Sequence, residues 1–123
     1  MQHGIQGFLN GQIINLADHI KDNLDIELLK RTPSSYLGSC RYKLPDVSEN
    51  KEIYEVIFDK LNELEIGYFF YIGWNDSMDT IYKLSEYGKS INSIIRFVGV
   101  PKTIDNDLAA TDHTPGFGSA AKY

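Results

Sequence analysis

Two polar loops follow runs of apolar residues and carry side chains suited to phosphate chemistry. The first, residues 73–77, reads Gly-Trp-Asn-Asp-Ser and leads into an amphipathic stretch. The unpaired N–H groups and dipole of a helix N-terminus attract phosphate, and glycine allows close backbone approach. Asn or Asp can also hold a hydrated Mg²⁺ ion. The alternative is capping alone, because Asn, Asp and Ser are preferred before a helix.

The second loop, residues 101–107, reads Pro-Lys-Thr-Ile-Asp-Asn-Asp. Asp105 and Asp107 stand at alternate positions, so their carboxylates point to one side if the segment is extended. Near a phosphate, one acid can take a proton from an attacking hydroxyl while the other orients it or supports a metal. Lys102 and Thr103 can bind phosphate oxygens. The alternative is a polar loop with an Asx-turn.

A third candidate is Arg41, whose planar guanidinium matches phosphate oxygens. The alternative is a solvated surface arginine. Cys40 is the single cysteine and has no identifiable histidine partner, which favours a buried or half-buried thiol in a reducing cytoplasm. The histidines show no zinc spacing.

The elements around these loops follow from hydrophobic periodicity. Residues 51–64 predict an amphipathic helix that Ser48 or Asn50 caps. Residues 66–72 are almost unbroken apolar and aromatic, which predicts a strand buried on both faces. No basic residues interleave this run, so its aromatic rings indicate core packing rather than stacking on nucleic-acid bases.

A second helix and a second strand follow. Residues 78–87 predict a helix that Gly88 ends, and residues 91–100 predict a strand. Helices and strands that alternate over short connections indicate a parallel α/β sheet with flanking helices. Ligands bind beyond the carboxyl ends of such strands, so we expect both polar loops to form one site.

The first part of the chain is less regular. Residues 5–16 predict a hairpin around Asn10-Gly11, and residues 17–29 predict a helix. A break at residues 32–35 then opens a polar loop.

Composition excludes several classes of protein. The 123 residues are 42% hydrophobic and 24% charged, which is typical of a globular domain. A net charge of −5, with no basic run longer than Lys30-Arg31, argues against sequence-independent nucleic-acid binding. No apolar run approaches the roughly 18–20 residues of a membrane span, and no leader is recognisable. We therefore expect a cytoplasmic protein with no membrane partner.

Three segments, in order, resemble the phosphofructokinase family: residues 32–42, 73–77 and 101–107. The flanking residues also fit, so the resemblance covers essentially the whole chain. It implies a Rossmann-like parallel sheet with flanking helices, of which residues 1–123 form a part. The N-terminal strand with its Gly-rich loop and the C-terminal portion of that fold are expected to lie outside this chain.

The resemblance implies phosphoryl transfer to the 1-hydroxyl of fructose 6-phosphate, a glycolytic reaction. Asp105 matches the family's proton acceptor, and Asp107 matches the supporting acid. Thr103 and Ile104 match contacts to the sugar phosphate. A full-length protein of this family is expected to be a homo-oligomer.

Other matching positions concern the phosphoryl donor. Arg41, Gly73 and Ser77 match the donor-binding segments. Asn75 stands where many members have an aspartate that holds Mg²⁺, and an amide is a weaker, neutral ligand.

Two positions bear on which donor is used. Members that use ATP tend to have glycine where this chain has Asp76 and Lys102, whereas members that use pyrophosphate tend to have Asp and Lys. An acid at Asp76 would repel the α-phosphate of ATP, and Lys102 would neutralise charge on the transferred phosphoryl group. The resemblance therefore favours pyrophosphate, with ATP as the alternative.

Trp74 departs from the family pattern, which has a glycine that lets the backbone approach the donor. An indole that points into the cleft would block pyrophosphate, and a positive φ would add strain. One explanation is a single-base change from a glycine codon. The other is an inactive relative that keeps the fold as a sugar-phosphate-binding or interaction module.

Overall fold

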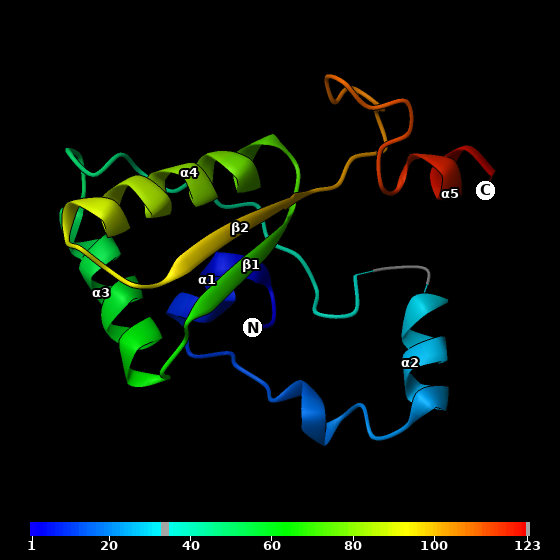
Figure 1. Cartoon of the computed structure of the whole chain (residues 1–123), viewed down its shortest axis with the longest axis horizontal. Helices are drawn as coiled ribbons and strands as arrows, with labels where there is room; N and C mark the ends of the chain where they lie inside the picture. The colour runs from blue at the N-terminus through cyan, green and yellow to red at the C-terminus, as the bar shows by residue number, and fades with distance from the viewer. Residues whose placement is uncertain (33–34, 123) are drawn as a thin grey trace. The chain divides into compact units, whose positions relative to one another are not determined.

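The computed structural model describes residues 1–32 and 35–122 (Figure 1). Pro33 and Ser34, within the predicted break, lie outside the described residues. The chain divides into two compact units, Met1–Tyr42 and Lys43–Tyr123, which are described separately below. Over the described part of the chain, no helix has the length and apolarity needed to cross a membrane.

The first unit begins with a helix, α1 (Gly4–Leu9), so the hairpin predicted over residues 5–16 is wrong. Gly11 adopts a left-handed φ of +72°. The N–H groups of Gly11 and Gln12 donate to α1 carbonyls at 3.0 and 2.8 Å. This pattern ends a helix at a glycine. The Asn-Gly pair therefore closes a helix here instead of joining two strands.

The helix predicted over residues 17–29 is divided in the structure. A short 3₁₀ turn, η1 (Leu16–Asp18), is followed by α2 (Asn23–Lys30). The Asp22 side chain accepts a hydrogen bond from the Asp25 N–H at 3.0 Å. Because an N-cap residue has a non-helical backbone, Asp22 starts a new helix at the centre of the predicted one.

The second unit opens with α3 (Lys51–Glu63), which confirms the predicted amphipathic helix. Asn50 is the cap, since its side chain accepts from the Ile53 N–H at 3.2 Å. One face of this helix is buried. It consists of Tyr54, Ile57, Phe58 and Leu61, while Val56 and Leu64 are exposed.

Two parallel strands form the sheet, β1 (Tyr68–Gly73) and β2 (Arg96–Pro101), with the connecting helix α4 (Asn75–Ser90) packed against both. The register pairs Gly73 with Pro101. Figure 1 shows this arrangement, with the short helix α5 (Phe117–Lys122) after the loop that follows β2. The predicted parallel α/β alternation is therefore confirmed.

The helix α4 and the strand β2 begin at other residues than the sequence predicts. The helix predicted over residues 78–87 begins three residues earlier, and it continues past Gly88. Gly88 is buried inside the helix, where a Cβ atom would lie 3.2 Å from Phe58 Cζ and 3.4 Å from Phe97 Cε2. The glycine therefore permits close packing and does not end the helix. The second strand begins at Arg96, later than predicted over residues 91–100.

One face of the sheet is covered and the other is exposed. Phe69 and Phe97 stack at a centroid distance of 5.7 Å, and Phe58 of α3 lies 5.5 Å from Phe97. On the opposite face Phe70 and Ile72 are 59% and 63% exposed. The prediction of a strand buried on both faces is therefore wrong for this chain, because the helices of the second unit cover only one side.

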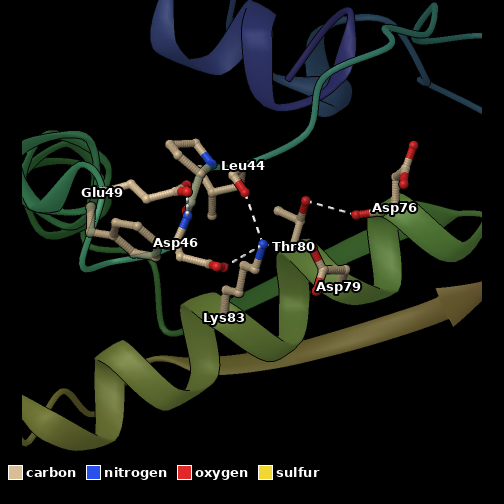
Figure 2. Close-up of polar contacts among 9 residues, drawn as sticks. Leu44, Asp46, Glu49, Asp76, Asp79, Thr80 and Lys83 are labelled. Carbon is tan, nitrogen blue, oxygen red and sulfur yellow. Dashed lines mark hydrogen bonds and ion pairs between the residues drawn. The ribbon is translucent and has the colours of Figure 1, made fainter.

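An ion cluster fastens the segment before α3 to α4 (Figure 2). Lys83 Nζ lies 2.8 Å from an oxygen of Asp46 and 2.8 Å from one of Asp79, and it donates to the Leu44 carbonyl at 3.0 Å. The hydrogen bond to Lys83, followed by its positive charge, lowers the pKa of Asp46 below its ordinary value of 3.8. Asp46 and Asp79 in turn raise the pKa of Lys83.

The Asp46 contact predicts a pH-dependent stability. Because the folded state lowers the pKa of Asp46, its contribution is present above about pH 4 and is lost as the pH falls further. We expect the urea midpoint of the wild-type chain to fall more between pH 5 and pH 3 than that of Asp46→Asn. Asp59→Asn, which alters an exposed acid on α3, should follow the wild type. Parallel curves for wild type and Asp46→Asn would contradict the prediction.

Candidate functional site

The two polar loops lie side by side, as the parallel sheet predicts. Gly73 and Pro101 are paired at the carboxyl ends of β1 and β2. Directly beyond this pair, the Lys102 N–H donates to the Gly73 carbonyl at 2.8 Å. The two polar loops therefore begin next to each other at the same edge of the sheet.

The first loop is a very short turn into α4. Trp74 is the N-cap, and its carbonyl accepts from the N–H groups of Ser77 and Met78 at 2.9 and 3.0 Å. Its side chain makes no capping hydrogen bond. The alternative in which Asn75, Asp76 or Ser77 caps the helix is therefore wrong, because all three lie within the first turn.

Gly73 is required by the packing of this turn. A Cβ atom on Gly73 would collide with the Ser77 side chain, at 2.8 Å from its Cβ. The hydroxyl of Ser77 therefore sits against the backbone where β1 ends. Gly73 and Ser77, two of the residues predicted to bind the donor, therefore lie against each other at the carboxyl end of β1.

The Trp74 backbone is extended, with φ −93° and ψ −161°. The strain that a positive φ would add is therefore absent. The indole is 51% exposed, so the structure accommodates it without burying it. What distinguishes Trp74 from glycine is the volume of its side chain beside the first turn of α4.

Asn75 and Asp76 are exposed in that first turn. The Asp76 carbonyl accepts from the Thr80 hydroxyl at 2.9 Å, while Figure 2 shows its carboxylate apart from the ion cluster of Lys83. Over residues 1–32 and 35–122, no three His, Cys, Asp or Glu side chains form a ready-made metal site. An ion here would therefore need further ligands from a bound phosphate or from water.

The second loop is bent rather than extended. Lys102, Asp105 and Asp107 are exposed, whereas Thr103 is 4% exposed. Asn106 has a left-handed φ of +55°. Because the segment is not extended, the alternate positions of Asp105 and Asp107 do not by themselves point their carboxylates to one side. The Asp105 N–H donates to the Thr103 hydroxyl at 3.0 Å, so a threonine side chain makes the local turn.

Asn106 in this loop and Thr114 beyond it were not predicted as site residues from the sequence. The side chain of Asn106 pairs with Thr114, and Thr114 is completely buried. An asparagine between two acids in a loop is a signal for a left-handed backbone, because Asn tolerates that conformation better than most residues. No periodicity in the sequence indicates that Thr114 is the partner of Asn106.

Arg41 belongs to the first unit, and its side chain is exposed. The turn before it is held by Ser35, whose hydroxyl donates to the Gly38 carbonyl at 2.6 Å. Gly38 has a φ of +70°, which glycine adopts without strain. Cys40 is a half-buried free thiol, as expected.

A hollow of about 460 Å³ lies beside the second loop and is lined by residues from His113 to Lys122. None of the predicted site residues lines it. The charged residues predicted in the two polar loops are instead exposed where they follow the strands: Asp76, Lys102, Asp105 and Asp107.

Comparisons with known proteins give a consistent result. The chain matches the Phosphofructokinase family over residues 1–123. It is 46% identical over 121 residues to a pyrophosphate–fructose 6-phosphate 1-phosphotransferase of Rhodospirillum rubrum, covering 98% of this chain and 28% of that protein. A Xanthomonas campestris protein of the same name is 43% identical over 122 residues, which are 99% of this chain and 29% of that protein.

A solved structure shares the fold. The crystal structure of a pyrophosphate-dependent phosphofructokinase from Marinobacter aquaeolei superposes with a TM-score of 0.83 at 42% identity, over 99% of this chain and 29% of that one. The chain thus spans less than a third of the length of these relatives.

Proposed function

Since the chain belongs to the phosphofructokinase family, we propose that it forms part of a phosphotransferase that moves a phosphoryl group from pyrophosphate to the 1-hydroxyl of fructose 6-phosphate. The observation that carries the proposal is the bond between Lys102 N–H and the Gly73 carbonyl. This hydrogen bond holds the turn at residues 73–77, which is suited to phosphate, next to the loop that carries the exposed Asp105 and Asp107. Relatives named for this reaction at 43–46% identity support it.

In the proposed reaction, Asp105 removes the proton of the 1-hydroxyl. The sugar oxygen then bonds to one phosphorus of pyrophosphate, the bridging P–O bond breaks, and phosphate leaves. Asp107 supports the base, and the exposed Ile104 lies where the sugar phosphate would bind. The hydroxyl of Thr103 is buried and paired within the loop, so we propose that Thr103 shapes the loop that binds the sugar phosphate.

The donor would lie over the first turn of α4. Gly73 allows close backbone approach there, Ser77 supplies its hydroxyl, and Lys102 supplies positive charge to the transferred phosphoryl group. We propose that Arg41 binds the donor from its own loop. The negative charge of Asp76 favours the shorter pyrophosphate over ATP.

Mg²⁺ fits this donor set as an ion held mainly by phosphate oxygens and water. Asn75 is exposed in the first turn of α4, where its amide oxygen would serve as a neutral ligand. When bound, the ion would neutralise charge on pyrophosphate. We further propose a cytoplasmic, homo-oligomeric full-length enzyme; the single cysteine suits a reducing compartment.

The test is a chimera in which residues 1–123 replace the aligned segment of the Rhodospirillum rubrum enzyme, with Trp74→Gly as the reference form. We expect kcat/KM for pyrophosphate to exceed that for ATP by roughly 100-fold or more, because like charges placed together cost several kcal/mol. The double variant Asp76→Gly, Lys102→Gly should narrow this ratio. A preference for ATP, or no turnover with either donor, would overturn the proposal.

Trp74 favours a second candidate, a sugar-phosphate-binding module that has lost turnover. Isothermal calorimetry on the Trp74 and Trp74→Gly chimeras separates the two functions. Binding of fructose 6-phosphate without binding of pyrophosphate, in both forms, would favour the module. Binding of both ligands favours the enzyme.

A further inference from the structure

Asp105 and Asp107 depend on their backbone for their position. Both side chains are exposed, and within the part of the chain that the structure describes no hydrogen bond or ion pair to their carboxylate oxygens is seen. The groups that hold this segment must therefore be sought in its backbone and in Asn106, which lies between the two acids.

Asn106 is tied to residues further along the chain. Its Oδ1 accepts from the Thr114 N–H at 2.9 Å and from the Thr114 hydroxyl at 3.2 Å. Its Nδ2 donates to the Asp112 carbonyl at 3.2 Å. Asn106 thus makes contacts through both ends of its amide, while its φ of +55° turns the backbone between Asp105 and Asp107.

Thr114 connects this amide to the base of the loop. Its hydroxyl also lies 3.1 Å from the Thr103 carbonyl, and its side chain is completely buried. The Thr103 N–H donates to the Pro115 carbonyl at 3.1 Å. Thr103 and Asn106, which lie on either side of Asp105, are therefore joined through one buried threonine.

We propose that the Asn106–Thr114 pair, called here the clasp, positions Asp105 for proton removal. The inference rests on the proposed function and adds two positioning residues to it. Asn tolerates the left-handed conformation but is not restricted to it, so the clasp supplies the contacts that keep the backbone turned. A displacement of about 1 Å of a catalytic group can cost roughly 100-fold in rate.

The first measurement is amide hydrogen exchange on the 123-residue chain. Thr114→Val removes the hydroxyl but keeps the shape and the N–H of residue 114, whereas Thr114→Ser keeps the hydroxyl. We expect Thr114→Val to speed exchange of the amides of Thr103, Asp105 and residue 114 roughly fivefold to tenfold, the effect of losing about one hydrogen bond. Amides of β1 and α4 should be unchanged, and Thr114→Ser should resemble wild type.

The second measurement is kinetic, in the Trp74→Gly chimera. Thr114→Val should lower kcat roughly 10- to 100-fold while KM for fructose 6-phosphate changes by less than about threefold, and Thr114→Ser should restore kcat. If Thr114 only stabilised the fold, Thr114→Val would lower the yield of folded enzyme without lowering the kcat of the folded fraction. Unchanged kcat in Thr114→Val, or an equal loss in Thr114→Ser, would overturn the clasp.

Asn106→Gly keeps the test decisive if Thr114→Val fails to fold, because glycine adopts the positive φ without strain but removes the amide. It should show the same local exchange and the same loss of kcat. If the reference chimera shows no turnover, the proposed function is wrong. The clasp is then tested by the hydrogen-exchange measurement only. Unchanged exchange in both variants would then overturn it.

Discussion

Asp105→Asn is expected to lower kcat of the Trp74→Gly chimera by roughly 10²- to 10⁴-fold, the usual contribution of a general base. The amide has the size and shape of the carboxylate but cannot take the proton of the 1-hydroxyl at neutral pH. The Asp105 side chain is exposed and makes no hydrogen bond within the loop. The hydrogen bond from its backbone N–H to the Thr103 hydroxyl does not involve the carboxylate. Steady-state kinetics with pyrophosphate measure the loss.

Asp112→Asn is the matched control for this variant. Asp112 is an exposed acid in the same connection between β2 and α5, and only its backbone carbonyl accepts the hydrogen bond from Asn106. It should retain kcat within about threefold, since surface changes away from special contacts have small effects. Both variants should also keep the urea midpoint of the reference. Normal kcat in Asp105→Asn would remove Asp105 from its role as base.

The parts of the fold that were predicted correctly depend on local signals. The α3 helix follows from apolar residues that recur at helical spacing, and its start follows from the preference of Asn50 for the cap. The parallel pairing of β1 and β2 follows from a helix between two apolar runs. Because parallel strands end at one edge, the meeting of the two loops could also be predicted.

The errors arise where distant contacts decide the structure. Asn10-Gly11 suits a hairpin turn and a helix end equally well, and the bond from Gln2 N–H to the Gln12 carbonyl at 2.8 Å favours the second arrangement. Gly88 suits a helix end by itself, but aromatic rings from α3 and β2 explain it as a packing site. Residue type alone could not distinguish these cases.

In the candidate site, too, the chemistry of single residues could be predicted, whereas contacts between distant residues could not. The identities of Asp105, Lys102 and Ser77 indicate phosphate chemistry because charge and donor groups are properties of single residues. The turn between the two acids depends on Thr114, eight residues beyond Asn106. No periodicity links these positions. From the sequence, the two carboxylates point to one side only if the segment is extended, and the structure has a bend there.

Trp74→Gly is expected to raise kcat/KM for pyrophosphate in the chimera by roughly 10- to 100-fold, the range for correcting a misplaced reacting group by about 1 Å. Trp74 is the N-cap of α4, directly between Gly73 and the first-turn N–H groups that suit a phosphate. Its indole is half exposed, and glycine would remove this volume while allowing the same extended backbone. KM for fructose 6-phosphate should change by less than about twofold, because the sugar binds at the other loop.

Trp74→Phe is the control for size, since it keeps an aromatic ring at the same position and should remain close to the unsubstituted chimera. The unfolding free energies of the Trp74 and Trp74→Gly forms should differ by less than about 1 kcal/mol. The φ of −93° stores no strain for glycine to release, and glycine is an acceptable N-cap. If the unsubstituted chimera already turns over as fast as Trp74→Gly, the indole does not obstruct the donor. Trp74 would then be a tolerated substitution at the mouth of a working site, and the argument for an inactive binding module would lose its only support.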